Sequence, residues 1–132
     1  MEDMRYTILM DPDYGEALFW DKHGCNIGGY DYLFIGDESN VIEIELSSID
    51  DLKEWFWEWD HESLNHTNNW TLTQWKEWWE RGLKLAKEIK AILPKNVDLY
   101  YFTIQDSVWT VRPEESNDGG IFNYGEPMKI TL

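Results

Sequence analysis

The sequence predicts an α+β fold in which two helices pack on one face of an antiparallel sheet, as a single domain over residues 1–132. Two long stretches have the apolar spacing of amphipathic helices. Segments with strand composition stand on both sides of them, an order typical of helices gathered on one face of a sheet. The length of 132 residues is that of one ordinary domain with one core.

Strand composition precedes the predicted helices at residues 4–10, 30–35 and 41–46. In the third segment Glu43 and Glu45 fall on one face, and the apolar residues between them fall on the other. One polar face favours an antiparallel sheet over a parallel sheet covered on both sides. Between the first two strands, a short apolar piece at 17–20 is followed by a glycine-rich stretch that indicates turns. Strand composition resumes after the helices at 97–104, 107–112, 121–124 and 128–131.

The first helix is predicted to open at Ser48, with Asp51 three residues further on. Its apolar stripe consists of Ile49, Leu52, Trp55, Phe56 and Trp59. The opposite side is an acidic ridge without lysine or arginine, made of Asp51, Glu54, Glu58 and Glu62. Trp57 lies about 140° from the centre of the apolar stripe, at the edge of the ridge. We therefore expect Trp57 to be the tryptophan least involved in the core.

The second predicted helix runs from Thr71 to Leu93 and is the main core helix. Its apolar residues recur at steps of three and four, and opposite charges stand four residues apart on its other face. Thr71 and Gln74 form a capping box, and Pro94 cannot continue the helix. Gly82 stands inside the apolar stripe, where glycine costs about 1 kcal/mol relative to alanine. We therefore expect another backbone or a tryptophan ring to approach Gly82 closely.

The chain is strongly acidic, and its charge is unevenly distributed. It carries 26 acidic and 11 basic residues, for a formal net charge of −15. Residues 1–70 hold 17 acidic and three basic residues, whereas residues 71–132 hold nine acidic and eight basic. Such a field repels nucleic acid and anionic membranes and steers cationic partners toward the first half of the chain. An acidic surface that serves only solubility is the alternative.

The first residues lack the basic and then apolar pattern of a secretory signal, and no stretch reaches the roughly 18 apolar residues of a membrane span. The single cysteine, Cys25, cannot form an internal disulfide. These features predict a cytoplasmic protein. Nine tryptophans, seven tyrosines and five phenylalanines exceed what a core of this size usually holds. We therefore expect some rings at the surface or at an interface.

The sequence holds no motif that indicates catalysis. It lacks G-x-S-x-G, a P-loop, a dinucleotide fingerprint and C-x-x-C. His61 and His66 are five residues apart, about 140° on a helix, so they cannot share a metal ion. Carboxylate pairs are too frequent for any one to mark an acid and a base. We expect no enzyme, no cofactor and no metal site, with a hydrolase built on a carboxylate-only metal site as the alternative.

The framework residues follow the pattern Leu52-x-x-Trp55-Phe56-x-x-Trp59, then Trp75-x-x-Trp78-Trp79-x-x-Gly82-x-x-Leu85-Ala86-x-x-Ile89, then Leu93-Pro94-x-x-Val97-x-Leu99-Tyr100. This pattern resembles small acidic bacterial immunity proteins that are encoded beside polymorphic and contact-dependent growth inhibition toxins. The resemblance covers roughly residues 46–102. It implies a cytoplasmic protein that binds one cognate toxin domain and blocks its active site or an essential surface. It assigns no functional residue.

Together these features predict an inhibitor whose acidic surface binds a basic toxin nuclease, because nuclease sites present lysine and arginine to phosphates. The predicted contacts are the acidic ridge with Trp57 and the acidic residues of two loops. They are Asp51, Glu54, Trp57, Glu58, Glu62, Asp11, Asp13, Asp37 and Glu38. The alternatives are a DNA-mimic regulator of a nucleic-acid-binding protein, and a small-ligand or enzyme domain with an aromatic-lined pocket.

Overall fold

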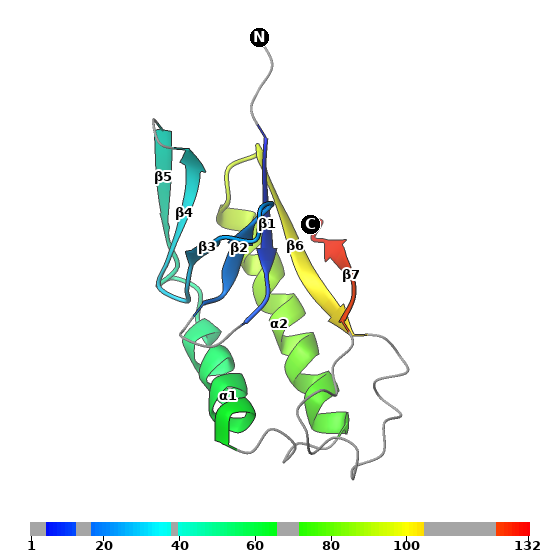
Figure 1. Cartoon of the computed structure of the whole chain (residues 1–132). Coiled ribbons are helices and arrows are strands. Elements are labelled where there is room, and N and C mark those ends of the chain that lie inside the picture. The colour runs from blue at the N-terminus through cyan, green and yellow to red at the C-terminus, as the bar shows by residue number, and fades with distance from the viewer. Residues whose placement is uncertain (1–4, 13–16, 38–39, 66–71, 105–123) are drawn as a thin grey trace.

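The computed structural model describes residues 5–12, 17–37, 40–65, 72–104 and 124–132. Its elements are the strands β1 (Tyr6–Met10), β2 (Phe19–Asp21), β3 (Asn26–Gly28), β4 (Tyr32–Asp37), β5 (Asn40–Glu45), β6 (Val97–Ile104) and β7 (Tyr124–Lys129), and the helices α1 (Leu52–Asn65) and α2 (Leu72–Ile92). Figure 1 shows the two helices beside each other, with α2 running behind the sheet. The predicted α+β class is confirmed.

The seven described strands form one sheet in the order β5-β4-β3-β2-β1-β6-β7. Strands β1 to β5 are successive antiparallel neighbours. The chain then passes through both helices and returns on the other side of β1, where β6 pairs parallel to β1 and β7 pairs antiparallel to β6. The prediction of an antiparallel sheet is therefore wrong for one pair. A helical crossover separates β6 from the first strands, and parallel neighbours need such a connection.

Two strand predictions differ from the structure in detail. The glycine-rich stretch, where we expected only turns, contains β3. This strand pairs with β2 on one side and with β4 on the other. Near the C-terminus, β7 runs without a break from the end of the predicted strand 121–124 into the predicted strand 128–131, and residues 121–123 lie outside the described residues. The predicted strand 107–112 lies outside the described residues. Short strands such as β3 carry too few residues for a clear alternation.

Both predicted helices are present, but α1 begins at Leu52 and not at Ser48. The reason is local: Asp51 has a φ of 71°, so the residue before the helix is in the left-handed region. The carbonyl oxygen of Asp51 then accepts a hydrogen bond from the backbone N–H of Trp55 at 2.8 Å. Helix α2 follows the prediction closely, and Pro94 lies just beyond its end. The capping residue Thr71 lies outside the described residues.

A stacked pair of tryptophans joins the two helices. The rings of Trp55 in α1 and Trp78 in α2 have centroids 4.4 Å apart and planes within 2° of parallel. Each indole N–H donates to the backbone carbonyl of the other residue, with Nε1 to O distances of 2.8 Å from Trp55 and 2.9 Å from Trp78. Both side chains are buried. The pair therefore buries much apolar surface and leaves neither indole N–H without an acceptor.

The close approach predicted at Gly82 is confirmed. A Cβ added there would collide with Tyr101 Oη and with the indole ring of Trp55, whose Cε2 atom would lie 2.8 Å away. Tyr101 Oη donates a hydrogen bond to the carbonyl oxygen of Trp79 at 2.9 Å. Only a residue without a side chain allows α1, α2 and β6 to meet this closely. This packing offsets the low helix propensity of glycine.

Two consecutive aromatic residues fasten β6 to α2. The register of β6 shifts between Tyr101 and Thr103, and such a bulge turns neighbouring side chains toward the same face. The Tyr101 ring lies 5.3 Å from that of Trp79, and the Phe102 ring lies 6.0 Å from that of Trp78. Trp79 Nε1 donates to the Phe102 carbonyl at 2.8 Å. The core is thus held by aromatic rings whose polar atoms are hydrogen-bonded across elements.

Candidate partner-binding surface

The acidic ridge of α1 is exposed but lies next to a cation of α2. Asp51, Glu54 and Glu58 are exposed, as predicted. Both carboxylate oxygens of Glu58 accept hydrogen bonds from Arg81, at 2.9 and 2.7 Å. These bonds raise the pKa of Arg81, and the charges of Asp51 and Glu54 raise it further. The ridge itself contains no basic residue, but the tertiary fold places Arg81 of α2 against it.

Trp57 is 51% exposed, which confirms that it lies outside the core. Its Nε1 donates to the hydroxyl of Tyr30 at 3.3 Å, and the two rings meet edge to face with centroids 6.5 Å apart. The ammonium group of Lys53 lies 4.9 Å from the centroid of the Trp57 ring. A cation over the ring face is an attractive contact. The surface of α1 therefore presents the Trp57 ring, with the Lys53 ammonium group over it, next to the exposed carboxylates of the ridge.

The remaining predicted contact residues are less accessible or lie outside what the structure describes. Asp11 is half-buried, and its backbone binds the β2 segment through a hydrogen bond from its N–H to Leu18 O at 2.8 Å. Asp13 and Glu38 lie outside the described residues. Asp37 ends β4 and Glu62 lies in α1, but their side chains are outside the described part. These residues stay predictions.

The structure brings together a second surface, which sequence reasoning missed. It is the solvent-facing side of the β4–β5 hairpin, made of Tyr32, Phe34, Val41, Glu43 and Glu45, and we call it the outer hairpin face. Tyr32 stands opposite Glu45, and Phe34 stands opposite Glu43, in the register of the two strands. The exposed fractions of the three apolar residues are 43%, 45% and 58% in the order Tyr32, Phe34, Val41. The Tyr32 and Phe34 rings stack with centroids 6.5 Å apart.

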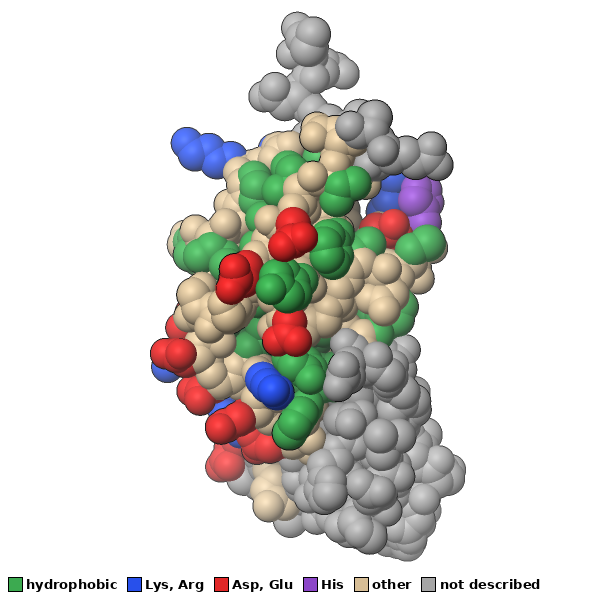
Figure 2. Space-filling view, turned by 90° about the vertical axis from the view of Figure 1, so that its left-hand side faces the viewer, with side chains coloured by type: hydrophobic (Ala, Val, Ile, Leu, Met, Phe, Trp, Pro, Cys, Tyr) green, Lys and Arg blue, Asp and Glu red, His purple; other side chains and the backbone are tan. Residues whose placement is uncertain are grey.

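The residues between them on β4 explain why these rings face solvent. Leu33 and Ile35 are buried, so the side chains on either side of each must point the other way. The half-buried Ile42 and Ile44 of β5 pair with these two and lie on the same inner face. The outer hairpin face is therefore fixed by the alternation of both strands. Figure 2 shows the side of the molecule that carries the hairpin, where hydrophobic and acidic side chains are interleaved.

The sequence held a signal for this face, but it required the pairing of two strands. The alternation of Glu43 and Glu45 is visible in the sequence, and so are aromatic residues at 32 and 34. Their juxtaposition depends on the two-residue connection between Asp37 and Asn40, which sets the register. Taken separately, β5 shows an acidic face and β4 shows two aromatic residues. Paired as a hairpin, the two strands form one surface that mixes aromatic rings with carboxylates.

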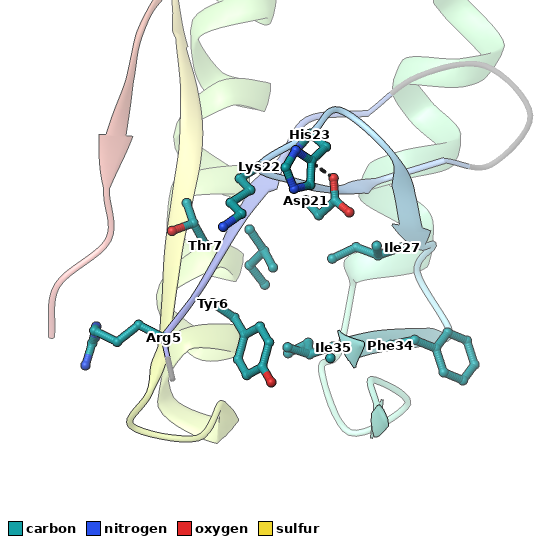
Figure 3. A pocket seen from close by; sticks show the side chains of 11 residues that line it. Arg5, Tyr6, Thr7, Asp21, Lys22, His23, Ile27, Phe34 and Ile35 are labelled. Carbon is teal, nitrogen blue, oxygen red and sulfur yellow. Dashed lines mark hydrogen bonds between the residues drawn. The ribbon is translucent and has the colours of Figure 1, made fainter. Parts of the chain in front are cut away.

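A pocket of about 350 Å³ opens between β1 and β4 beside the β2–β3 turn (Figure 3). Tyr6, Ile27 and Ile35 point into it, whereas Phe34 points away. The guanidinium of Arg5 also points away, and it forms an ion pair with Asp98 at 2.6 Å. The pocket is therefore lined by apolar side chains together with polar ones.

Three polar residues of the lining are consecutive in the chain: Asp21, Lys22 and His23. The Asp21 carboxylate accepts hydrogen bonds from the backbone N–H groups of Cys25, at 3.0 Å, and His23, at 2.8 Å. These bonds lower the pKa of Asp21, the bond from Cys25 most. Asp21 thus holds the β2–β3 turn closed, and Cys25 itself is exposed. Within the described residues no three histidine, cysteine or acidic side chains are grouped to hold a metal ion.

None of the helices in the described ranges is long and apolar enough to cross a membrane. Comparisons with protein-family models, with curated proteins and with solved structures give no match.

Proposed function

We propose that this protein is a cytoplasmic immunity protein that binds a basic toxin domain, a nuclease, and neutralises it through an acidic and aromatic surface. The observation that carries the proposal is the outer hairpin face. It combines exposed aromatic rings with carboxylates directly opposite them, on a chain with a net charge of −15. Aromatic anchors next to charged groups are where binding energy concentrates in protein interfaces.

The electrostatics support a cationic partner. A nuclease presents lysine and arginine to phosphates, so a carboxylate-rich surface can occupy those side chains in place of nucleic acid. A DNA-mimic regulator would need carboxylates along an extended surface. On the outer hairpin face the carboxylates of Glu43 and Glu45 alternate instead with Tyr32 and Phe34. This mixture favours a folded protein partner that has apolar as well as basic side chains.

The proposal is tested with the toxin domain encoded by the reading frame next to this gene. Expression of that domain alone is expected to arrest growth, and co-expression of this protein is expected to restore it. A stable complex of the two purified proteins should form as well. If the neighbouring frame encodes no toxin, or if the toxin domain neither binds this protein nor is neutralised by it, the proposal is wrong.

The pocket between β1 and β4 supports a second candidate function, the binding of a small ligand. Its volume of about 350 Å³ is at the lower end of ligand sites, and Lys22 and His23 are among its lining residues. Ile27→Trp should fill the pocket from one wall. If Ile27→Trp folds and still neutralises the toxin, the pocket is not part of the inhibitory surface. If neutralisation is lost while the outer hairpin face is intact, the pocket is favoured as the functional site.

A further inference from the structure

We propose that the partner binds by strand addition along the free edge of β5. The added segment is extended and alternates basic with apolar side chains. This inference rests on the proposed function in one respect, because it takes the partner to be a basic protein. It goes further by assigning the contact to the backbone of one strand and by stating the pattern of the segment that pairs with it.

Strand β5 lies at the end of the sheet, and no described strand pairs with its outer side. It pairs with β4 over six consecutive residues without a register shift. Exposed sheet edges are normally protected by proline, lysine, bulges or very short strands. The opposite edge, β7, has such protection: it contains Pro127 and Lys129, and the register of its pairing with β6 shifts. The β5 edge contains neither proline nor lysine, and its charged residues, Glu43 and Glu45, disfavour an acidic strand but not a basic one.

The main-chain groups that point outward from β5 can be identified from the register. Leu46 N–H donates to Asp31 O at 2.9 Å, so these two form a hydrogen-bonded pair. In an antiparallel ladder, hydrogen-bonded and non-hydrogen-bonded pairs alternate. Ile42 and Ile44 therefore bond to β4, whereas residues 41, 43 and 45 direct their N–H and C=O groups away from it. Three alternate residues of β5 thus direct a donor and an acceptor to the side where no described strand pairs with it.

The side chains of β5 define what an added strand would carry. On the inner face Ile42 and Ile44 are half-buried, so apolar side chains on the added strand would extend the core over them. On the outer face Glu43 and Glu45 are exposed, so basic side chains would face them. Successive residues of a strand point to opposite faces. The complementary segment therefore alternates lysine or arginine with valine, isoleucine or leucine.

A second copy of this chain does not fit the same edge. Two β5 strands paired about a two-fold axis would place Glu43 and Glu45 of one copy near the same residues of the other. Like charges directly opposite each other destabilise a strand pair. Each copy also carries a net charge of −15, which opposes association. The charge pattern thus selects a basic partner over self-pairing.

The test uses an eight-residue peptide of alternating lysine and valine, blocked at both ends, and the full-length protein labelled with nitrogen-15. One control peptide has glutamate in place of lysine. A second has the same sequence but carries N-methyl groups on the backbone nitrogens of the lysines, which lie opposite Glu43 and Glu45 when the peptide adds antiparallel; this removes the donors that face β5 and leaves the charge unchanged. Amide exchange of β5 is measured by NMR with each peptide. The free protein should show slow exchange at Ile42 and Ile44 and fast exchange at Val41, Glu43 and Glu45.

At saturation with the lysine–valine peptide, exchange at Val41, Glu43 and Glu45 is expected to slow about tenfold or more, because bound amides are protected. Neither control peptide should slow it. Glu43→Pro removes one outward N–H and should weaken binding of the lysine–valine peptide, whereas Glu43→Gln keeps that N–H and should weaken binding less. The peptide measurement on the unaltered protein decides the matter even if Glu43→Pro does not fold.

Unchanged exchange at the three outward amides, or equal slowing by the N-methylated peptide, would overturn strand addition. Binding that perturbs only α1, near Trp57, would overturn it too, while leaving a basic partner in place. Failure of the toxin domain to bind this protein concerns the proposed function and is measured separately. The two failures are therefore distinguishable.

Discussion

Gly82 is the residue whose substitution should affect folding most sharply. Its missing side chain lets the Trp55 ring and Tyr101 Oη rest against α2. Gly82→Leu is expected to lower the free energy of unfolding by about 1–3 kcal/mol or more, because an overpacked core must move its rings. Ala91→Leu, at an exposed position of the same helix, is the control and should change stability by less than about 0.5 kcal/mol. Urea denaturation compares the two, and an unchanged midpoint for Gly82→Leu would contradict the packing described.

Trp57 is the residue that tests the α1 ridge as a contact surface. If the ridge binds the partner, Trp57→Ala should weaken binding by about 2 kcal/mol or more. Arg81→Gln should then strengthen binding, because it removes the cation that pairs with Glu58. Isothermal titration calorimetry with the toxin domain measures both. Full-strength binding by both folded variants would assign the contact to another surface, and unfolding of Trp57→Ala would mean that its ring is structural.

The helical phase of the sequence explains why some residue predictions are confirmed and others are incomplete. Exposure of Trp57 and close packing at Gly82 follow from the spacing within one helix, and both are confirmed. The pairing of Arg81 with Glu58 links two helices. Spacing within one helix places Arg81 near Glu77 instead. Contacts between elements depend on how the helices are placed against each other, which local patterns do not specify.

Among the elements, Asp98 links β6 to β7 and to the residue that precedes β1. Its carboxylate pairs with Arg5 at 2.6 Å and with Lys129 of β7 at 3.6 Å. The hydrogen bond from Arg5, with the charges of Arg5 and Lys129, lowers the pKa of Asp98 in the folded protein. A carboxylate with a lowered folded pKa stabilises the fold above its unfolded pKa, and this contribution is lost as pH falls through the folded pKa.

Asp98→Asn should therefore be less stable than the wild type at neutral pH. The difference between the two should shrink as pH falls below the ordinary pKa of aspartate, about 3.9, and on through the lowered pKa of Asp98 in the folded protein. Urea denaturation at a series of pH values measures the free energy of unfolding of each. Asp50→Asn, at an exposed position, serves as the control. A difference that stays constant down to the lowest pH would mean that the ion pairs of Asp98 do not support the fold.

The strands and helices themselves were largely predictable, because alternation and helical spacing are local properties. The first strand, the strand at 41–46, both helices and the strand at 97–104 all correspond to elements of the structure. The order of strands in the sheet was not predictable in the same way. The parallel pairing of β1 with β6 joins segments about 90 residues apart. The short β2 and β3 carry too little pattern to be distinguished from turns.

At the scale of the whole molecule, the charge makes association with a basic partner dependent on salt. The net charge of −15 attracts a cationic protein over long distances, and salt screens this attraction. The association rate constant should fall steeply as ionic strength rises, whereas the dissociation rate should change much less. Stopped-flow measurements with the toxin domain across a salt series test this. An association rate constant that does not change with salt would contradict long-range electrostatic attraction between the two proteins.

The candidate surface was only partly predictable from sequence for a reason that also lies at this scale. The exposed carboxylates of α1 could be found from one helix. The outer hairpin face requires β4 and β5 to be paired in the observed register, so that Phe34 meets Glu43. A shift of one residue would place the rings in the core instead. A surface formed by two elements can therefore be located only once their pairing is known from the structure.

The central claim, that the outer hairpin face binds a basic partner, is tested most directly by two double variants with the same change in charge. One is Glu43→Lys with Glu45→Lys, on the outer hairpin face. The other is Glu80→Lys with Glu88→Lys, at exposed positions of α2. The measurement is the dissociation constant for the toxin domain. We predict that the hairpin variant loses at least about 100-fold in affinity, since like charges then meet at the interface, and that the helix variant loses less than about tenfold. Equal losses in the two variants, or a hairpin variant that folds and binds at full strength, would contradict the claim.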